Sequence, residues 1–221
     1  MQTIVLASAS PRRSELLARA GIPFVALPAN IDESIGSESP GEHTQRLSEA
    51  KAEAALERIL SSRDEVRKDA ISEEMLVLSR ILDGSAIWVL GADTVIDLDG
   101  IVLGKPEDQV EARSMIESLS GRYHEVVTGI CLLRHGGEHD DLLVDSVRTR
   151  VQFGDLGKRE IEAYIESGDW KDAAGAYRIQ SLGETLVESI EGSYSNVVGL
   201  PLRRFCGMLQ RYGYFIENGR I

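Results

Sequence analysis

Basic side chains gather beside a pair of serines early in the sequence. Ser8 and Ser10 precede Arg12 and Arg13, and Pro11 stands between them where a helix would begin. The first amides of a helix point their N–H donors outward and carry partial positive charge, which suits a phosphate group. Two guanidinium groups would add planar donors that stay charged. The alternative is a capped helix whose two arginines are simply solvated.

Further charged residues that could serve the same chemistry lie far along the chain. Asp93 follows a buried apolar run and is predicted to end a strand at the carboxyl edge of a sheet, where it could hold a divalent cation or polarise a water molecule. A turn or N-cap aspartate is the alternative. Glu33 lies in an acidic loop that could be merely solvated. Lys51 lies in or beside the apolar stripe of a helix, where snorkelling is the default, and Lys105 lies in a Gly-Lys-Pro turn.

Together these four basic groups and two carboxylates suit a polyphosphate that is bound with a divalent metal ion. Catalysis at such a site comes from positioning and electrostatics. The histidines show no metal-ligand spacing, and no nucleophile-elbow pattern accompanies the serines, so a covalent serine mechanism is not expected. The glycine-rich stretches 175–180 and 192–201 would let the backbone approach a ligand closely, unless they are ordinary turns.

Composition excludes several classes of protein. The 221 residues are 43% hydrophobic and 27% charged, which excludes a wholly disordered chain and allows a sizeable core. A formal net charge of -12 argues against a general nucleic-acid binder but leaves room for a small anionic ligand. No segment approaches the roughly 20 apolar residues that span a bilayer. We expect a cytoplasmic protein that binds neither nucleic acid nor membrane, with Cys131 and Cys206 reduced.

Apolar runs and helical periodicity predict the elements that would hold these residues in place. The predicted strands cover residues 3–7, 24–27, 86–90, 95–98, 101–103, 125–133 and 142–153. The predicted helices cover residues 11–21, 43–60, 75–82, 107–119, 156–167 and 202–212. Asp99-Gly100 is the strongest hairpin signal in the chain. The pattern predicts an α/β protein with a mixed sheet.

The ordered set of motifs resembles the Maf family of nucleoside triphosphate pyrophosphatases over nearly the whole chain. The segments that carry the resemblance are 6–13 (LASASPRR), Asp32-Glu33, Lys51-Ala52, 91–94 (GADT), 104–106 (GKP), 175–180 (GAYRIQ) and 192–201. Each is weak alone, but their order is highly specific. The resemblance implies a mixed β-sheet flanked by helices, akin to inosine triphosphate pyrophosphatases, in a protein that is often a homodimer. It also implies hydrolysis of a nucleoside triphosphate to the monophosphate and pyrophosphate with a divalent metal (Mg²⁺, Mn²⁺ or Co²⁺).

Roles for individual residues also follow from the resemblance. Asp93 looks like the family's general base, with Glu33 beside it near the metal. The residues that look like its phosphate-binding set are Ser8, Arg12, Arg13, Lys51 and Lys105. Arg12, Thr94 and Gln180 resemble the branch that acts on dTTP and UTP. The branch that acts on methylated guanosine triphosphate tends to have tryptophan and glutamate in place of Arg12 and Gln180.

Two features depart from the family pattern. The segment between Lys51 and Asp93 is longer than usual, which implies an insertion around 61–85 within a single domain spanning 1–221. Ser181 stands where the pyrimidine branch usually has glycine, beside the predicted base pocket. One alternative function is a nucleotide-sensing regulator of cell division or septum formation without turnover. Another is a house-cleaning enzyme for modified nucleotides. Retention of every charged group that catalysis needs favours an enzyme.

Overall fold

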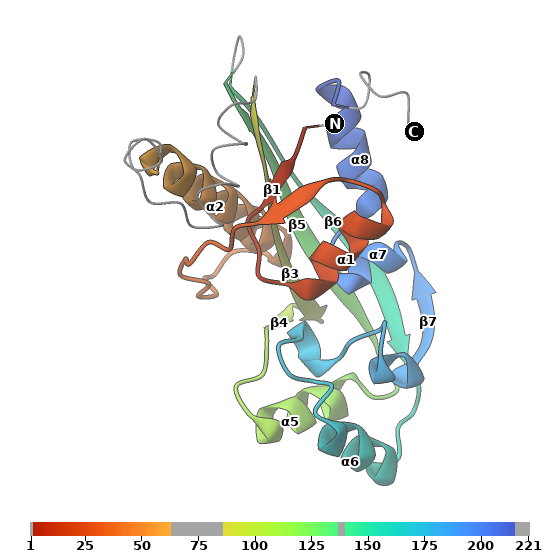
Figure 1. Ribbon diagram of the computed structural model, residues 1–221. Coiled ribbons are helices and arrows are strands. Elements are labelled where there is room, and N and C mark those ends of the chain that lie inside the picture. Colours follow the sequence, from red (N-terminus) through yellow and green to blue (C-terminus); the bar gives the residue numbers. More distant parts are fainter. Residues whose placement is uncertain (1, 63–85, 137–139, 215–221) are drawn as a thin grey trace.

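A seven-stranded mixed sheet flanked by helices forms the molecule, as the sequence predicts (Figure 1). This computed structural model describes residues 2–62, 86–136 and 140–214. The strand order is β2-β1-β3-β5-β6-β7, and β4 pairs with β3 off this path. The strands β1 and β2, and β1 and β3, run parallel, while the other pairs are antiparallel. The helix predicted over 75–82, and nearly all of the insertion predicted around 61–85, lie outside the described residues.

Most bounds follow the predicted pattern, but residues 87–98 form one strand where two were predicted, and residues 187–191 and 194–198 form elements that were not predicted. The strands are β1 (Ile4–Leu6), β2 (Phe24–Ala26), β3 (Ile87–Leu98), β4 (Ile101–Leu103), β5 (Tyr123–His135), β6 (Asp141–Phe153) and β7 (Val187–Glu191). The α-helices are α1 (Pro11–Arg19), α2 (Pro40–Ser61), α5 (Gln109–Leu119), α6 (Lys158–Ser167), α7 (Tyr194–Val198) and α8 (Leu202–Arg211), and the 3-10 turns are η1 (Ala174–Ala176) and η2 (Leu182–Leu186). Within the described ranges, no helix combines the length and apolar character that crossing a membrane requires.

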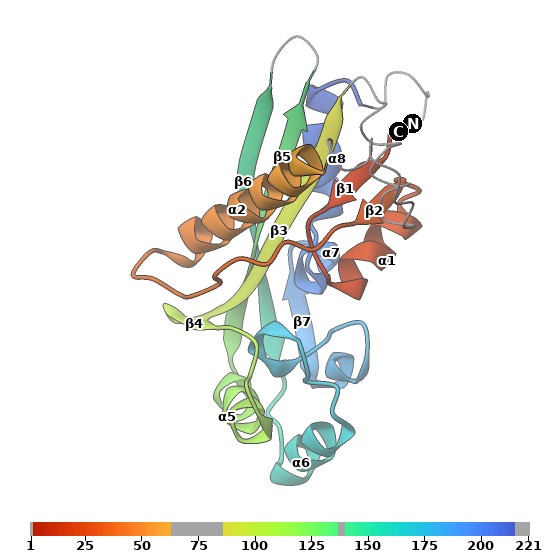
Figure 2. The same cartoon turned by 60° about the vertical axis from the view of Figure 1, so that its left-hand side comes forward.

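Helix α2 lies across one face of β3 and β5 (Figure 2). Two glycines allow this close approach. A Cβ atom added at Gly91 would lie 1.9 Å from the Ser48 carbonyl oxygen, and one at Gly129 would lie 2.1 Å from the Thr44 carbonyl oxygen. Real Cβ atoms are not found so near a backbone oxygen, because protein interiors are close-packed. The glycines therefore set how near α2, and the lysine it carries, can come to the sheet.

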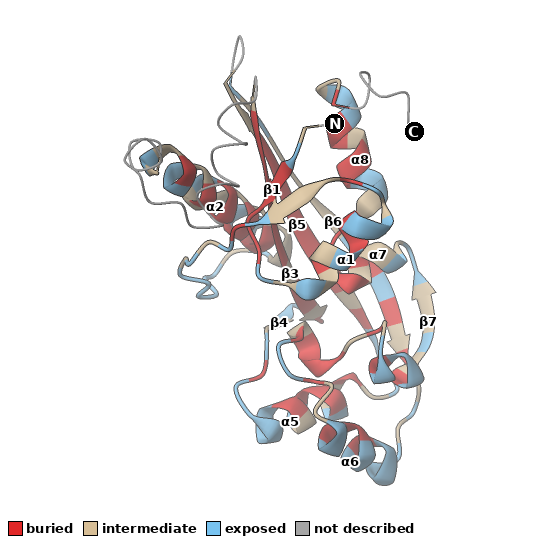
Figure 3. Cartoon of the chain, in the orientation of Figure 1, coloured by how far each residue is buried: buried red, intermediate tan, exposed pale blue. Residues whose placement is uncertain are grey.

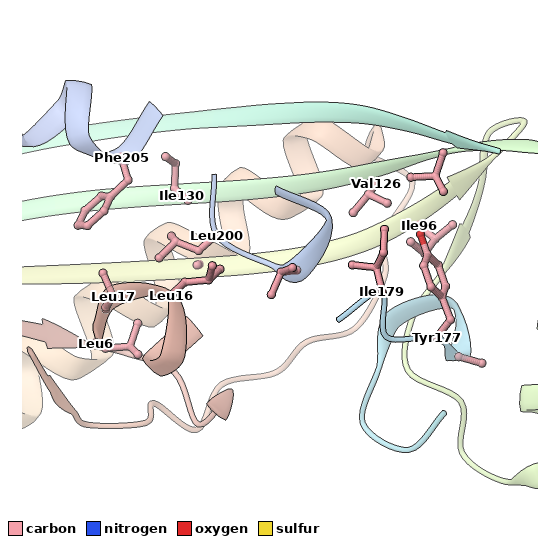
Figure 4. Packing of buried hydrophobic residues seen from close by; sticks show 14 of the residues in the cluster. Leu6, Leu16, Leu17, Ile96, Val126, Ile130, Tyr177, Ile179, Leu200 and Phe205 are labelled. Atoms are coloured by element: carbon pink, nitrogen blue, oxygen red, sulfur yellow. The ribbon is translucent and has the colours of Figure 1, made fainter. Parts of the chain in front are cut away.

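The opposite face of the sheet is covered by α1, α7 and α8. Apolar side chains of these helices pack against the strands, and most of the central sheet is buried (Figure 3). Leu17 on α1, Ile130 on β5 and Phe205 on α8 are fully buried, and Leu200 lies between these elements (Figure 4). Helix α1 ends as predicted at a glycine: Gly21 has φ +67°, and the amide of Ile22 donates back to the Leu17 carbonyl oxygen at 3.0 Å.

The strand that carries Asp93 is longer than the sequence predicts. Its residues pair with β5 without a break from Ile87 to Asp97, so Asp93 lies in the middle of β3 and does not end a strand. The reason is that the antiparallel ladder with β5 continues through this stretch and satisfies the backbone groups that face β5, and the glycine at 91 faces a helix rather than a turn. The prediction of a strand end at Asp93 is wrong in this respect.

A gap between β1 and β4, which both pair with β3, nevertheless opens beside Asp93. Strand β1 pairs with β3 only as far as Leu6 opposite Leu90, and β4 pairs with β3 from Ile96 onward. Between these two partners, among the strands that the structure describes, residues 91–95 have β5 on one side alone. The carboxyl end of the parallel strand β1 and the start of α1 thus face the middle of β3, which is where ligands of such sheets bind.

Candidate active site

One pocket of about 440 Å³ lies at this gap. Its lining comes from the turn between β1 and α1, the loop before α2, α2 itself, the middle of β3, and the segments that follow β4 and η1. All of the residues predicted from the sequence for a site line it: Ser8, Arg12, Arg13, Glu33, Lys51, Asp93, Thr94, Lys105 and Gln180. Side chains as far apart in the sequence as Ser8 and Gln180 therefore meet in one pocket.

Lys51 lies between two carboxylates at the centre of the pocket. Its Nζ atom is 2.7 Å from Asp93 Oδ1 and 2.7 Å from Glu33 Oε1. Lys51 and Asp93 are buried, so the ammonium does not extend to solvent as snorkelling would require. Lys105 is more exposed and approaches the other oxygen of Glu33 at 3.6 Å. The approach of α2 to the sheet at Gly91 is what brings this lysine to the aspartate.

The charges around Glu33 outweigh the effect of its burial. Partial burial would raise the pKa of Glu33, but the hydrogen bond from Lys51 and the positive charges of Lys51, Lys105 and Arg13 lower it, and the net pKa is below the ordinary value. Glu33 is therefore ionised at neutral pH. With Asp93 it gives the pocket two carboxylate groups on a shared ammonium.

Arg13 reaches across the pocket from α1 and is held at three of its nitrogen atoms. Its Nη1 atom donates to Ser8 Oγ at 2.7 Å, its Nε atom to the Gly199 carbonyl oxygen at 2.9 Å, and its Nη2 atom to Thr94 Oγ1 at 3.1 Å. Burial lowers the pKa of Arg13, although the nearby charge of Asp93 opposes this shift. An arginine remains protonated under such a shift, so the pocket keeps a fixed, buried positive charge.

Arg12 lies on the side of the pocket formed by the segment from Asp172 to Gln180. Its Nη2 atom donates to the Asp172 carbonyl oxygen at 3.0 Å, and burial followed by the charge of Arg178 lowers its pKa. Gln180 lies on the same side, and its Oε1 atom is buried without a hydrogen-bond partner in the described part of the chain. A buried, unpartnered carbonyl oxygen that lines a pocket is suited to accept a hydrogen bond from a ligand.

The segment 172–180 takes an irregular path that glycine alone would not explain. Three of its residues have left-handed backbone angles: Asp172 at φ 57°, Gly175 at φ 63° and Ala176 at φ 61°. A Cβ atom at Gly175 would lie 2.4 Å from Ile96 Cγ1, so the backbone must pass close to β3 there. This path turns Tyr177, Arg178 and Gln180 toward the pocket.

Sequence reasoning gave no role to several residues that line or adjoin the pocket. Tyr177 and Arg178 belong to a quoted motif, so the resemblance marked their segment but not their side chains. Thr128 contacts Thr94 from β5, where a threonine within an apolar strand gives no signal of its own. Among the described residues, no group of three or more histidine, cysteine or acidic side chains could hold a metal ion. The two acidic side chains that contact Lys51 in the pocket are Glu33 and Asp93.

Comparisons with known proteins agree with these motifs. The family described as Maf-like protein matches residues 3–212. The chain is 43% identical over 220 residues to a dTTP/UTP pyrophosphatase of Symbiobacterium thermophilum, covering 99% of this chain and 98% of the relative. It is 45% identical over 201 residues to a dTTP/UTP pyrophosphatase of Geobacter sp. (strain M21), covering 90% of each. It is 37% identical over 222 residues to one of Caldicellulosiruptor bescii, covering 100% of each. The family match over residues 3–212 includes every segment that lines the pocket.

Proposed function

This chain belongs to the Maf family, and we propose that it hydrolyses dTTP and UTP to the nucleoside monophosphate and pyrophosphate. Relatives that match along their whole length are named for that pair of substrates. The observation that carries the proposal is the meeting of Arg13, Lys51 and Asp93 in one pocket. Buried positive charge beside a carboxylate that lines the same pocket suits hydrolysis of a phosphoanhydride.

The triphosphate would lie at the end of the pocket formed by Ser8, Arg13, Lys51, Lys105 and Asp93, which we term the phosphate end. Its basic groups would neutralise the phosphates and stabilise pyrophosphate as it leaves. The start of α1 is also free to face an anion, since Ser10 occupies the N-cap position without a side-chain cap hydrogen bond. Arg12 would reach the same ligand from the opposite wall.

Asp93 would orient the attacking water and accept its proton. Water attacks the α-phosphorus in line with the departing pyrophosphate, so one P–O bond forms as the P–O bond to pyrophosphate breaks, and the water proton passes to the Asp93 carboxylate. Lys51 fixes the orientation of that carboxylate through its 2.7 Å hydrogen bond. Lys51 is itself buried on α2, so its position relative to Asp93 depends on how α2 packs against the sheet.

The two carboxylates also fit a divalent metal such as Mg²⁺, Mn²⁺ or Co²⁺. Asp93 and Glu33 converge on one point, where Lys51 now contacts both, and Mg²⁺ is commonly held by one or two carboxylates together with substrate oxygens. Such an ion would supply positive charge to the phosphates. The homodimer, the single domain and the cytoplasmic location implied by the sequence stay predictions.

Gln180 would read the pyrimidine at the other end of the pocket, which we term the base end and define by Ile96, Val126, Tyr177 and Gln180. Uracil and thymine both present an N–H donor between two carbonyl groups. The unpartnered Oε1 of Gln180 can accept from that donor while its amide nitrogen donates to a carbonyl. The apolar residues beside it would contact the ring.

A substrate panel tests the proposal. The protein is incubated with Mg²⁺ and UTP, dTTP, CTP, GTP or modified pyrimidine triphosphates, and both pyrophosphate and the monophosphate are measured. We expect fastest release from UTP and dTTP, in equal amounts of the two products. Tight binding of UTP without product would contradict the proposal and support a nucleotide-sensing regulator. A clear preference for modified nucleotides would instead identify a house-cleaning enzyme.

A further inference from the structure

We propose that Thr94, Thr128 and Asn196 form a buried hydrogen-bond chain that positions Arg13 for a triphosphate, so that the Thr94 hydroxyl acts through Arg13 rather than on the nucleotide base. The chain runs from the pocket through β3 and β5 to α7. The inference rests on the proposed function only in taking the ligand to be a triphosphate. Thr128 and Asn196 would be positioning residues, since neither lines the pocket.

The donors of Arg13 are divided between the protein and the pocket. A guanidinium has five N–H donors. Three of them go to Ser8 Oγ, Thr94 Oγ1 and the Gly199 carbonyl oxygen. All three acceptors are uncharged, so the hydrogen bonds fix the side chain without neutralising it by direct contact. The remaining donors are left for an anionic ligand, in an orientation that the three acceptors determine.

The hydrogen bonds on either side determine the direction of the hydrogen bond between Thr94 and Thr128. Thr94 Oγ1 accepts from Arg13, and Thr94 Oγ1 and Thr128 Oγ1 are 3.0 Å apart. Thr128 Oγ1 donates to the Asn196 carbonyl oxygen at 3.2 Å, so its proton is used there. Thr94 must therefore donate its own proton to Thr128, which commits the Thr94 hydroxyl on both sides. Successive bonds of this kind polarise and strengthen one another in a buried site.

Asn196 anchors the far end of the chain. Its side-chain amide nitrogen donates to the Val126 carbonyl oxygen and to Thr149 Oγ1, each at 3.0 Å, and the residue is fully buried. It lies on the five-residue helix α7, which is followed directly by Gly199, whose carbonyl oxygen accepts from Arg13 Nε. The side-chain amide of Asn196 thus holds α7 in place. This helix supplies the Asn196 backbone carbonyl that ends the hydrogen-bond chain, and Gly199 directly after it accepts from Arg13.

A structural role alone is the competing explanation, because buried threonines also stabilise sheets. The test compares Thr128→Val, which keeps the shape and removes the hydroxyl, with Thr128→Ser, which keeps the hydroxyl. Binding of inorganic triphosphate is measured by calorimetry, and kcat/KM is measured for UTP and dTTP. We expect Thr128→Val to weaken triphosphate binding about fivefold, the scale of one net hydrogen bond, and Thr128→Ser to recover most of that loss.

Base independence separates a role through Arg13 from a role in base recognition. Thr128→Val should change the dissociation constant of inorganic triphosphate and the kcat/KM for UTP and dTTP by the same factor. Thr44→Val is the matched control, because the Thr44 hydroxyl is equally buried but donates to the Pro40 and Gly41 carbonyl oxygens instead. An equal loss in Thr44→Val, or a loss with UTP but none with triphosphate, would overturn the inference.

A double-mutant cycle completes the test. The second substitution is made in an Arg13→Lys background, where the hydrogen bond from Arg13 to Thr94 is already lost. If Thr128 acts through Arg13, Thr128→Val should then weaken triphosphate binding by less than about twofold. An undiminished effect in that background overturns the inference. Thr94→Val, at a less buried position, should reproduce the loss if Thr128→Val does not fold. A wild-type chain that binds triphosphate without hydrolysing UTP refutes only the proposed function, whereas one that does not bind triphosphate refutes the inference.

Discussion

The phosphate end of the pocket and the base end are held in place by different parts of the fold. The phosphate end lies on the sheet and on two helices packed against it, and its side chains are fixed by ion pairs and by the three hydrogen bonds of Arg13. The base end combines Ile96 and Val126 of the sheet with Tyr177 and Gln180 of the segment 172–180, whose backbone is irregular. The Oε1 atom of Gln180 has no hydrogen-bond partner among the described residues. The first arrangement suits a group common to all nucleotides, and the second suits a group that varies.

The anchors of the two ends show the same contrast. Lys51 is placed by close helix-to-sheet packing at Gly91, which any change in volume would disturb. The segment 172–180 is instead held by buried side chains such as Tyr177 and Ile179 and by hydrogen bonds. These include the 2.9 Å bond from the Gly175 amide to the Gly104 carbonyl oxygen and the 3.1 Å bond from Tyr164 Oη to the Ala176 carbonyl oxygen. Substitutions at the base end can therefore change specificity while the phosphate end is preserved.

Removal of the catalytic carboxylate at the phosphate end should have the largest effect. Asp93→Asn keeps the size of the side chain and removes its charge, so we expect kcat for UTP to fall about a hundredfold or more, as when a general base is lost. Asp155→Asn, at an exposed position away from the pocket, is the control and should keep full activity. Near-normal turnover in Asp93→Asn, measured by pyrophosphate release, would contradict the assignment of the base.

Packing at the phosphate end can be disturbed without touching a charged group. In Gly91→Ala the new methyl group would meet the Ser48 carbonyl oxygen, so α2 must move away from β3 and take Lys51 with it. We expect a loss of about 1–3 kcal/mol in the free energy of unfolding, measured in urea, together with reduced kcat. Gly207→Ala is the control, since nothing lies within 4 Å of its added Cβ atom and alanine favours the helix. Unchanged stability in Gly91→Ala would mean that this contact does not fix α2.

Changes at the base end should alter preference more than turnover. In Gln180→Glu the amide donor is lost, and the carboxylate can only accept. We expect the ratio of kcat/KM for UTP over GTP to fall about tenfold, the scale of a mispaired polar group, while the affinity for inorganic triphosphate, measured by calorimetry, stays at the wild-type value. The contrast between the two ends would be contradicted by an unchanged preference for UTP over GTP. It would also be contradicted if the affinity for inorganic triphosphate fell by as large a factor as kcat/KM for UTP.

The sequence predicted the phosphate end better than the base end for a physical reason. Strand and helix periodicity placed α1, α2 and β3, and the motifs on them carry charged residues whose chemistry is visible from their type alone. Their meeting depends on contacts far apart in sequence, such as Lys51 with Asp93, which periodicity does not predict. Only the ordered resemblance did so.

Other features left little local signal. Strand β7 lies between the two glycine-rich stretches, where no strand was predicted, because a five-residue edge strand with three polar residues has no clear apolar pattern. Alanine is not a residue type that favours left-handed backbone angles, so the sequence does not predict the turn at Ala176. Thr128 is a polar residue in an apolar strand, and its partner becomes visible only when β3 and β5 are paired. Long-range pairing thus accounts for most of what the sequence did not predict.

The smallest expected effect concerns the anchor of Tyr177 at the base end. Its hydroxyl lies 2.9 Å from His124 Nε2, and burial lowers the pKa of His124 from 6.5 to about 4. The unfolded chain therefore takes up a proton that the folded chain refuses, so stability is present above pH 6.5 and falls as the pH drops toward the folded value. Between pH 6.5 and about 5.5 this loss should be about 1 kcal/mol in urea unfolding.

His124→Gln, which cannot titrate but can still form a hydrogen bond with Tyr177, should lose that part of the pH dependence. His135→Gln, on the surface beside Asp140, should keep it. If the two variants show the same slope, the neutral His124 is not what ties the base end to the sheet.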